Sequence, residues 1–449
     1  MKNTAYDDSS IIIGPESIRS RYGVLDYIGN LGEEPEAGYL RAAYSDDETR
    51  AMKVLAEAAQ DAGLRCRWDK LGNLTIETPG NFREWVETGS HLDTVPYGGN
   101  FDGLAGVVAG LEALIVIQRC GKSLKRGMRL RIWRGEESAT FGSSTMGSKG
   151  AFGILDPQVL SNRFKGISLR EAMLGQGCDP SLVEKRIATI PLEEVDGICA
   201  YIELHIEQGN LLERSGKKLG IVQGIRGAAR MMVTLEGAFD HSGATPMGIE
   251  YRKDVNLALG HIIVRLDELA AGHIETGMDL VQTIGLINSS PELNDVDSHV
   301  YRNAVTKVSG FAYFSHEVRS RSSDESDLFC LEAKEVILNT AKEFGVSAVI
   351  KDLGRTAGIP SLSMAVQAAL EASSYEIGAS SMKMYSGAWH DAAVVACRQK
   401  SDGSKVPTGM LFIPCKDGKS HSPEEYSSPE QIARGATVLA RAMLRLAEG

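Results

Sequence analysis

Short apolar runs alternate with helical segments through the first half of the chain, and this alternation constrains the fold more than any other feature. Strands are predicted at residues 74–78, 128–135 and 197–206, and helices at residues 47–63 and 105–121. The first helix ends at Gly63, a residue typical of the position just after a helix. Strands that alternate with helices of this length favour an α/β fold with a largely parallel sheet.

The pattern changes near residue 225. A helix is predicted at residues 251–272, a strand at 310–320 and a second helix at 324–345, and the α/β pattern resumes after about residue 353. Since 449 residues exceed the usual size of a single core, two domains are expected. We therefore predict a discontinuous α/β domain formed by residues 1–225 and 353–449. A smaller α+β domain, residues 226–352, is inserted between its two parts.

Composition disfavours several classes of partner and setting. The formal net charge of −11 disfavours binding to nucleic acid or to an anionic membrane surface. The seven cysteines are scattered and form no C-x-x-C pair, which argues against a disulfide framework and against a cysteine zinc site. No apolar run approaches the ~18 residues of a membrane helix, and the N-terminal run of three is too short for a signal peptide. We therefore expect a cytoplasmic protein without nucleic-acid or membrane partners.

The stretch SHLDT, residues 90–94, places His91 and Asp93 two positions apart. On a strand these side chains share a face, so Asp93 could fix the tautomer of a metal-bound His91. Asp102 follows in the glycine-rich GGNFDGLAG, where a carboxylate could bridge two cations. The same residues also fit a loop histidine beside an acid and an Asp102 that caps a helix.

Two glutamates follow the predicted strand at residues 128–135. In WRGEESATFG, Glu136 and Glu137 can both enter one cleft if the chain turns at the strand end. A two-metal hydrolase needs one carboxylate on a metal and a second, free carboxylate as general base. A pair of solvated glutamates is the alternative interpretation.

Four further histidines lie in turns beside predicted strand ends: His205, His241, His390 and His421. His205 ends an apolar strand, the position at which ligand sites form in α/β sheets. Gln208, close behind it, offers an amide donor and acceptor to an amide-like substrate. Each histidine could instead be an ordinary core or loop residue. Together with the histidine of SHLDT, however, five of the nine histidines fall in such turns, which favours a metal site.

Taken in order, these motifs resemble the zinc-dependent aminoacylase and carboxypeptidase clan. Within it, YIELHIEQG, HSGATPM, SGAWHDA and FIPCKDGKSH resemble the group of allantoate amidohydrolases, N-carbamoyl-L-amino-acid hydrolases and β-ureidopropionases. YLRAAYSDDETRAM and DKLGNLTIE also look like the opening of that group. The resemblance therefore spans nearly the whole chain.

The resemblance implies a ligand set for two divalent metal ions. Asp102 would bridge the ions, with His91 and His205 completing one site and Glu137 and His421 the other. Zn²⁺ or Mn²⁺ suits such a set, with Co²⁺ or Ni²⁺ possible, because affinity order alone does not select among these metals.

The resemblance also implies catalytic and structural roles. Glu136 would be the general base that deprotonates the attacking water, with Asp93 orienting His91. His241, on the inserted domain, would reach the cleft of a neighbouring subunit and stabilise the oxyanion. The inserted domain is then a lid and dimerisation domain, and the protein a homodimer.

The sequence departs from these relatives on the substrate side. Alignment of residues 302–320 with the family's carboxylate-binding segment puts Thr306 where an Asn is usual and Arg319 at the position of the carboxylate-binding Arg. Trp389 replaces the glycine before His390, and residues 245–254 are two longer than the usual spacing. We predict Gln208, Thr306, Arg319 and His390 as substrate-binding residues.

The predicted function is hydrolysis of a linear ureido or amide C–N bond in a small molecule, such as an N-carbamoyl amino acid or an allantoate-like compound. The departures leave open an N-acyl amino-acid hydrolase, a dipeptidase or a hydrolytic deaminase of the same clan. A catalytically inactive binding homologue is a further alternative, although inactive homologues usually lose ligands first.

Overall fold

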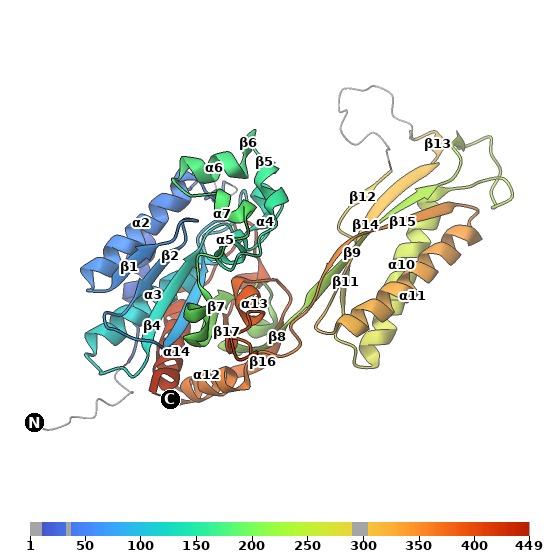
Figure 1. Cartoon of the computed structure of the whole chain (residues 1–449). Coiled ribbons are helices and arrows are strands. Elements are labelled where there is room, and N and C mark those ends of the chain that lie inside the picture. Colours follow the sequence, from blue (N-terminus) through green and yellow to red (C-terminus); the bar gives the residue numbers. More distant parts are fainter. Residues whose placement is uncertain (1–10, 33–36, 290–303, 449) are drawn as a thin grey trace, which may run out of the picture. The chain divides into compact units, whose positions relative to one another are not determined.

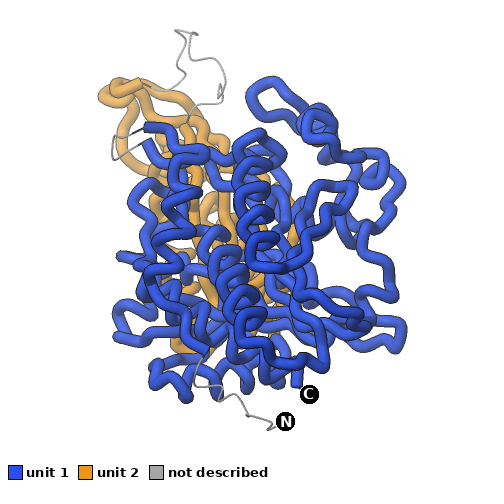
Figure 2. Tube along the Cα trace, turned by 90° about the vertical axis from the view of Figure 1, so that its left-hand side faces the viewer, with its two compact units in different colours: residues 1–223, 361–449 blue, residues 224–360 orange. Residues whose placement is uncertain are grey.

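The computed structural model describes residues 11–32, 37–289 and 304–448 of the chain. The chain forms two compact units (Figure 2). Unit 1 consists of Met1–Gln223 and Ser361–Gly449, and unit 2 of Gly224–Pro360. The predicted fold class, an α/β domain with a smaller domain inserted into it, is confirmed (Figure 1).

A mixed sheet forms the centre of unit 1. Within the described residues its strands follow the order β1 (Arg65–Trp68), β2 (Leu74–Glu77), β4 (Gly127–Trp133), β3 (Trp85–His91), β7 (Ile198–Ile206), β17 (Thr408–Ile413), β8 (Leu219–Ile225) and β16 (Ser381–Ser386). The four central strands, β4, β3, β7 and β17, pair in parallel. Their carboxyl ends therefore meet at one edge of the sheet, although they come from distant parts of the sequence.

One face of this sheet carries the main apolar core. The helices α1 (Pro15–Gly23), α2 (Asp46–Asp61), α3 (Leu104–Arg119), α12 (Met364–Glu376) and α14 (Pro429–Glu448) contribute to that core. On β7, Ile202 and Leu204 face the core. Since side chains alternate along a strand, Glu203 and His205 face the opposite side, where Glu203 accepts a hydrogen bond from the first turn of α13 (Asp391–Ala396).

Short elements complete unit 1. They are α4 (Ser138–Phe141), α5 (Met146–Ala151), α6 (Leu169–Gly175), α7 (Ser181–Glu184), α8 (Leu192–Asp196), α9 (Leu211–Ser215), the 3-10 helices η2 (Pro157–Ser161) and η3 (Lys416–Gly418), and the strand pair β5 (Arg163–Phe164) and β6 (Ile167–Ser168). Within the described residues, no helix combines the length and apolarity needed to cross a bilayer.

Gly106 sets how closely α3 approaches the sheet. A Cβ at this position would lie 2.1 Å from the carbonyl oxygen of Leu204 and 2.9 Å from the Cβ of Ser90. Only a glycine therefore lets the helix lie directly against β7. Because α3 begins just after Asp102, the close packing of α3 against β7 also fixes the position of Asp102 at the carboxyl edge of the sheet.

Unit 2 is an antiparallel sheet with two helices packed on one face. The sheet comprises β9 (Gly227–Glu236), β11 (Val281–Thr283), β12 (Ile287–Asn288), β14 (Phe311–Ser320) and β15 (Ser347–Thr356), and the helices are α10 (Val255–Glu275) and α11 (Ser323–Glu343). A separate pair is formed by β10 (Asp240–His241) and β13 (Lys307–Val308). The boundary that we predicted after residue 352 falls inside β15, which pairs with β9 along its length.

His316 is a buried, polar member of the unit 2 sheet. Its Nε2 lies 2.8 Å from Oε1 of Gln282, and its Nδ1 has no hydrogen-bond partner. Its ring lies 6.2 Å from that of Phe329, so its surroundings are largely apolar. Because burial disfavours the charged form, the pKa of His316 falls from 6.5 to about 4.

Replacement of Gly106 by alanine should destabilise unit 1. The added methyl group must displace α3 from β7, and overpacking of this kind costs about 1–3 kcal/mol. The control is Gly260→Ala in α10, where a Cβ meets nothing within 4 Å. That change should stabilise its helix by roughly 0.5–1 kcal/mol. Thermal unfolding of both variants measures the difference, and equal melting temperatures would contradict the close packing at Gly106.

Unit 2 should lose stability below about pH 6.5 because of His316. The unfolded chain takes up a proton on this histidine near pH 6.5, whereas the folded chain does so only near pH 4. The free energy of unfolding therefore falls as the pH drops through this window, by up to about 3 kcal/mol. His316→Gln should flatten this dependence, and His261→Gln, at an exposed histidine on α10, should not. Urea unfolding between pH 4 and 7.5 tests the comparison.

Candidate metal centre

The residues predicted as metal ligands gather at the carboxyl edge of the unit 1 sheet. His91 is the last residue of β3, His205 lies near the end of β7, and Glu137 follows β4. Asp102 lies just before α3, and His421 lies in the loop after β17. The parallel order of the central strands therefore brings together residues that are up to 330 positions apart in the sequence.

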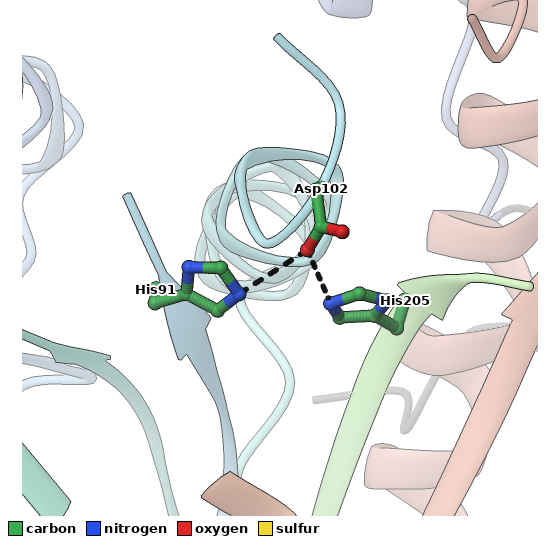
Figure 3. A group of neighbouring side chains, drawn as sticks. All are labelled: His91, Asp102 and His205. Atoms are coloured by element: carbon green, nitrogen blue, oxygen red, sulfur yellow. Dashed lines mark ion pairs between the residues drawn. The ribbon is translucent and has the colours of Figure 1, made fainter. Parts of the chain in front are cut away.

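Asp102 lies between two buried histidines (Figure 3). Its Oδ1 is 3.0 Å from Nε2 of His205 and 3.4 Å from Nε2 of His91. The three side chains come from the start of α3 and from two strands, and all are nearly inaccessible to solvent. Their ligand atoms lie within 4.8 Å of one another, close enough to share one cation.

The other oxygen of Asp102 faces a second group. His421 places its Nε2 3.5 Å from Oδ2 of Asp102 and 3.1 Å from Oε1 of Glu137. These three residues also have ligand atoms within 4.8 Å of one another. A single carboxylate thus has one oxygen directed to each of two potential cation sites, the geometry required of a bridging ligand.

The electrostatic environment of the cluster favours binding of a cation. Burial raises the pKa of Glu136 well above its usual value, with Glu137 adding to the effect and His91 opposing it. Burial likewise raises the pKa of Glu137, although His421 opposes the shift. The cluster therefore holds more buried carboxylates than its histidines can neutralise. Imidazole and carboxylate donors of this kind suit Zn²⁺ and Mn²⁺, and a bound cation would relieve the excess negative charge.

The histidines and Asp102 perturb one another. Burial opposes protonation of His91, but hydrogen bonds to Asp102 and Asp93 outweigh it and raise the pKa well above its usual value. Hydrogen bonds to Asp102 and Glu137 raise the pKa of His421 to about 11. Burial opposes ionisation of Asp102, yet the attraction of His205 and the hydrogen bonds from the histidines hold its pKa well below its usual value.

Glu136 lies beside this cluster without belonging to either group of potential ligands. Its Oε2 is 4.0 Å from Nε2 of His91, and the residue is 7% exposed. A carboxylate that is near the cations but not bound to them is what general-base catalysis requires.

Asp93 contacts the ring of His91 and accepts hydrogen bonds from the backbone of Glu136 and Glu137. Its Oδ1 lies 3.4 Å from Nδ1 of His91, which also lies 3.1 Å from the Asp93 carbonyl oxygen. Its two carboxylate oxygens accept the backbone N–H groups of Glu136 at 2.9 Å and Glu137 at 3.0 Å. Asp93 therefore fixes the turn after β4 as well as the ring of His91.

Gln208 and His390 also border the cluster. Nε2 of Gln208 donates to Oδ2 of Asp102 at 2.6 Å, while its Oε1 is buried without a partner. The ring of His390 lies 4.6 Å from that of His205, and its Nε2 is 2.8 Å from Oγ of Ser386. With Glu203 and His205, His390 forms a third group of potential metal ligands.

The remaining predicted residues belong to unit 2. His241 is exposed on β10, and its Nδ1 accepts the backbone N–H groups of Gly243 and Ala244, both at 3.1 Å. Thr306 is exposed, and its carbonyl oxygen accepts the N–H of Ser242. Arg319 lies on β14 and donates from Nε to Oε1 of Glu317 at 2.7 Å. His241 and Thr306 thus lie beside each other at the β10–β13 pair of unit 2, and Arg319 lies on its five-stranded sheet.

Sequence reasoning missed three buried glutamates that support the centre. Glu203 accepts the hydroxyl of Ser90 at 2.9 Å and the N–H of Ala392 at 2.7 Å. Glu48 accepts the N–H of Gly135 at 3.0 Å. Glu425 accepts N–H groups from two separate loops. Glu203 could have been recognised as sharing a strand face with His205, but nothing in the sequence distinguishes Glu425 from its neighbour Glu424.

Known proteins resemble the chain over nearly its full length. The model of peptidase family M20/M25/M40 matches residues 88–445. An N-carbamoyl-L-amino acid amidohydrolase of Geobacillus stearothermophilus is 32% identical over 425 residues, covering 94% of this chain and 97% of the relative. An allantoate amidohydrolase of Bacillus subtilis is 31% identical over 427 residues, covering 94% and 96%.

Solved structures share the fold as well. An amidase of the hydantoinase/carbamoylase family from Burkholderia multivorans superposes with a TM-score of 0.82 at 25% identity, covering 98% of this chain and 99% of the other. A second such amidase, from Burkholderia ambifaria, gives a TM-score of 0.80 at 28% identity, covering 97% and 98%.

Asp93→Asn should weaken cation binding to the centre. Asparagine keeps one acceptor oxygen, so only one of the N–H groups of Glu136 and Glu137 can be satisfied, and the turn shifts. Loss of a group that orients metal ligands typically costs 10–100-fold in metal affinity. Zn²⁺ titration of the metal-free protein measures this. The control is Asp254→Asn in unit 2, which removes the charge but keeps the acceptor, because a single oxygen, Oδ1, accepts the backbone N–H groups of both Asn256 and Leu257. Equal affinities in both variants would contradict the role of Asp93.

Proposed function

The chain belongs to peptidase family M20/M25/M40, and from this premise we propose that its metal centre holds two divalent ions and hydrolyses a linear ureido or amide bond. Members of the family depend on metal ions. Relatives that match nearly the whole chain are amidohydrolases of N-carbamoyl amino acids and of allantoate. The chain is accordingly an amidohydrolase that acts on C–N bonds other than peptide bonds. The proposed substrate is an N-carbamoyl amino acid or an allantoate-like compound.

The position of Asp102 carries the proposal of two ions. Its two oxygens face separate groups, one with His91 and His205 and the other with Glu137 and His421. The proposed ions are Zn²⁺ or Mn²⁺, with Co²⁺ or Ni²⁺ also compatible with these donors. When bound, such ions polarise a carbonyl oxygen and make water a stronger nucleophile.

Glu136 is the proposed general base. It takes one proton from the attacking water and delivers it to the nitrogen that leaves when the C–N bond breaks. Its place beside His91, outside both groups of ligands, leaves its carboxylate available for this transfer. Asp93 supports the base by holding its backbone N–H.

Substrate contacts are proposed for residues of both units. Gln208 presents a buried amide oxygen without a partner, which can accept a hydrogen bond from a substrate N–H group. His390 lies against His205 on the same side of the sheet. In unit 2, Arg319 and Thr306 are the proposed carboxylate-binding residues and His241 the proposed oxyanion-stabilising residue. Nε of Arg319 donates to Glu317, so the proposed substrate carboxylate would be bound by the other N–H groups of its guanidinium.

A homodimer formed through unit 2 is the proposed assembly. The outer faces of its helices carry large apolar side chains that are 45–59% exposed: Leu257, Val264, Leu328, Leu331 and Leu338. Large exposed apolar side chains are enriched at surfaces that contact another protein, and these five support the proposal. We also propose a cytoplasmic location, in keeping with seven cysteines that are all free.

The rival substrate classes use the same metal chemistry. N-acyl amino acids and dipeptides differ from carbamoyl compounds in the group attached to the scissile carbonyl, and deaminase substrates lose an amino group from a C=N carbon instead. Thr306 and the half-buried Trp389, next to His390, are the departures that keep these alternatives open. An inactive homologue is disfavoured because every proposed ligand and Glu136 are present.

A substrate screen tests the proposed function. Metal-free protein should be inactive, and protein reloaded with Zn²⁺, Mn²⁺, Co²⁺ or Ni²⁺ should release ammonia from ureido substrates. Release of an amine from N-acyl amino acids without ammonia from any ureido compound would favour the first rival class. No turnover of any ureido or amide substrate with all four metals would overturn the enzyme assignment.

Glu136→Gln should abolish turnover while preserving the metal content. Glutamine cannot accept the proton of the attacking water, and loss of a general base typically lowers the rate 10²–10⁴-fold. Metal content measured by elemental analysis should match the unchanged protein, because Glu136 lies outside both ligand groups. Retained activity would remove Glu136 from the role of base.

A further inference from the structure

Glu425 joins two loops of the metal centre. It lies before α14, is only 3% exposed, and uses both carboxylate oxygens. Oε1 accepts the backbone N–H groups of Phe101 and Asp102, both at 2.9 Å. Oε2 accepts the hydroxyl of Ser420 at 3.1 Å and the backbone N–H of His421 at 3.3 Å. One side chain thus holds two loops that are more than 300 residues apart in the sequence.

The close approach of Glu425 requires a glycine at position 99. A Cβ on Gly99 would lie 2.3 Å from Cβ of Glu425 and 2.4 Å from its Oε1. The rings of Phe101 and Tyr426, each next to a residue of this contact, also meet edge to face at 5.2 Å. The backbone at Gly99 and the ring contact of Phe101 with Tyr426 therefore both fit the position of the Glu425 carboxylate.

The two loops differ in how else they are held. Asp102 also contacts His91 and His205, which lie on strands and are each 1% exposed. His421 lies in a loop with a left-handed backbone, φ 56°, and its side chain is 49% exposed. The group formed by Asp102, Glu137 and His421 therefore depends more on Glu425 than the group anchored in the sheet.

We propose that Glu425 is a positioning residue that holds Asp102 and His421 at the spacing required for the second cation. This inference rests on the proposed function, since it concerns the same centre. Glu425 acts through backbone N–H groups and does not itself contact the cation. Its loss weakens the site of Glu137 and His421 and leaves the site of His91 and His205 nearly unchanged.

The experiment compares Glu425→Gln with Glu424→Gln. Glutamine offers one acceptor oxygen in place of two, so it can hold only one of the two loops, and its NH₂ group would face the N–H of the other. Glu424 is the adjacent residue, is exposed and pairs with Lys419, so the same substitution there controls for the change in charge. The full-length, metal-free proteins are titrated with Co²⁺, with uptake followed by the visible spectrum and by elemental analysis.

The unchanged protein and Glu424→Gln should take up two Co²⁺ ions per chain. Glu425→Gln should bind the first ion as the unchanged protein does and the second 10–100-fold more weakly, the usual effect of losing a group that orients ligands. Gly99→Ala, which displaces Glu425 without changing its charge, should reproduce this pattern. Gly14→Ala, where a Cβ meets nothing within 4 Å, is its control.

Two results would overturn the role of Glu425. The first is that Glu425→Gln and Gly99→Ala both bind two ions with unchanged affinities. Equal weakening of both sites, together with a lower melting temperature of the metal-free variants, is the other, because it indicates a general role in folding. A single ion bound by the unchanged protein would instead overturn the proposed two-metal function, and the two failures are therefore distinguishable.

Discussion

Buried carboxylates that accept backbone N–H groups hold the loops at the carboxyl edge of the unit 1 sheet. Asp93 accepts two such groups from the turn after β4, and Glu425 accepts three from the loops of Asp102 and His421. Burial of a charge is costly unless hydrogen bonds satisfy it. The same bonds fix irregular backbone where no strand or helix can do so. The centre is thus assembled by acids that do not themselves belong to the two groups of potential ligands.

The clustering of buried carboxylates is electrostatically unfavourable. Several carboxylates lie in a small buried volume, and the pKa values of Glu136 and Glu137 rise because burial and mutual repulsion disfavour their charged forms. Divalent cations bound at the proposed centre would relieve that repulsion. In the proposed centre, metal binding would be coupled to local folding, because a shared cation would connect the loops of Asp102 and His421 that Glu425 also joins.

Much of the fold could be predicted from the sequence, because strand and helix periodicity is a local property. The predicted strand at residues 197–206 corresponds to β7 (Ile198–Ile206), and the helix at 105–121 to α3 (Leu104–Arg119). The insertion was visible as a change of pattern near residue 225. Its far end was not, because the strand that crosses residue 352 belongs to unit 2 through its pairing with β9 and its packing on the unit 2 core. Pairing across a hundred residues leaves no trace in local composition.

The sequence by itself determined the chemical types at the centre and their order: His91, Asp102, Glu136, Glu137, His205 and His421. Local patterns placed each residue at the end of an apolar strand or in a glycine turn but left other interpretations open, and the resemblance to a known clan supplied the expected ligand set. Only the tertiary structure decided that each oxygen of Asp102 faces a different group, and that Glu425 rather than Glu424 joins the two loops. Which of two adjacent acids is buried depends on packing between segments that are distant in the chain. No local pattern encodes that packing.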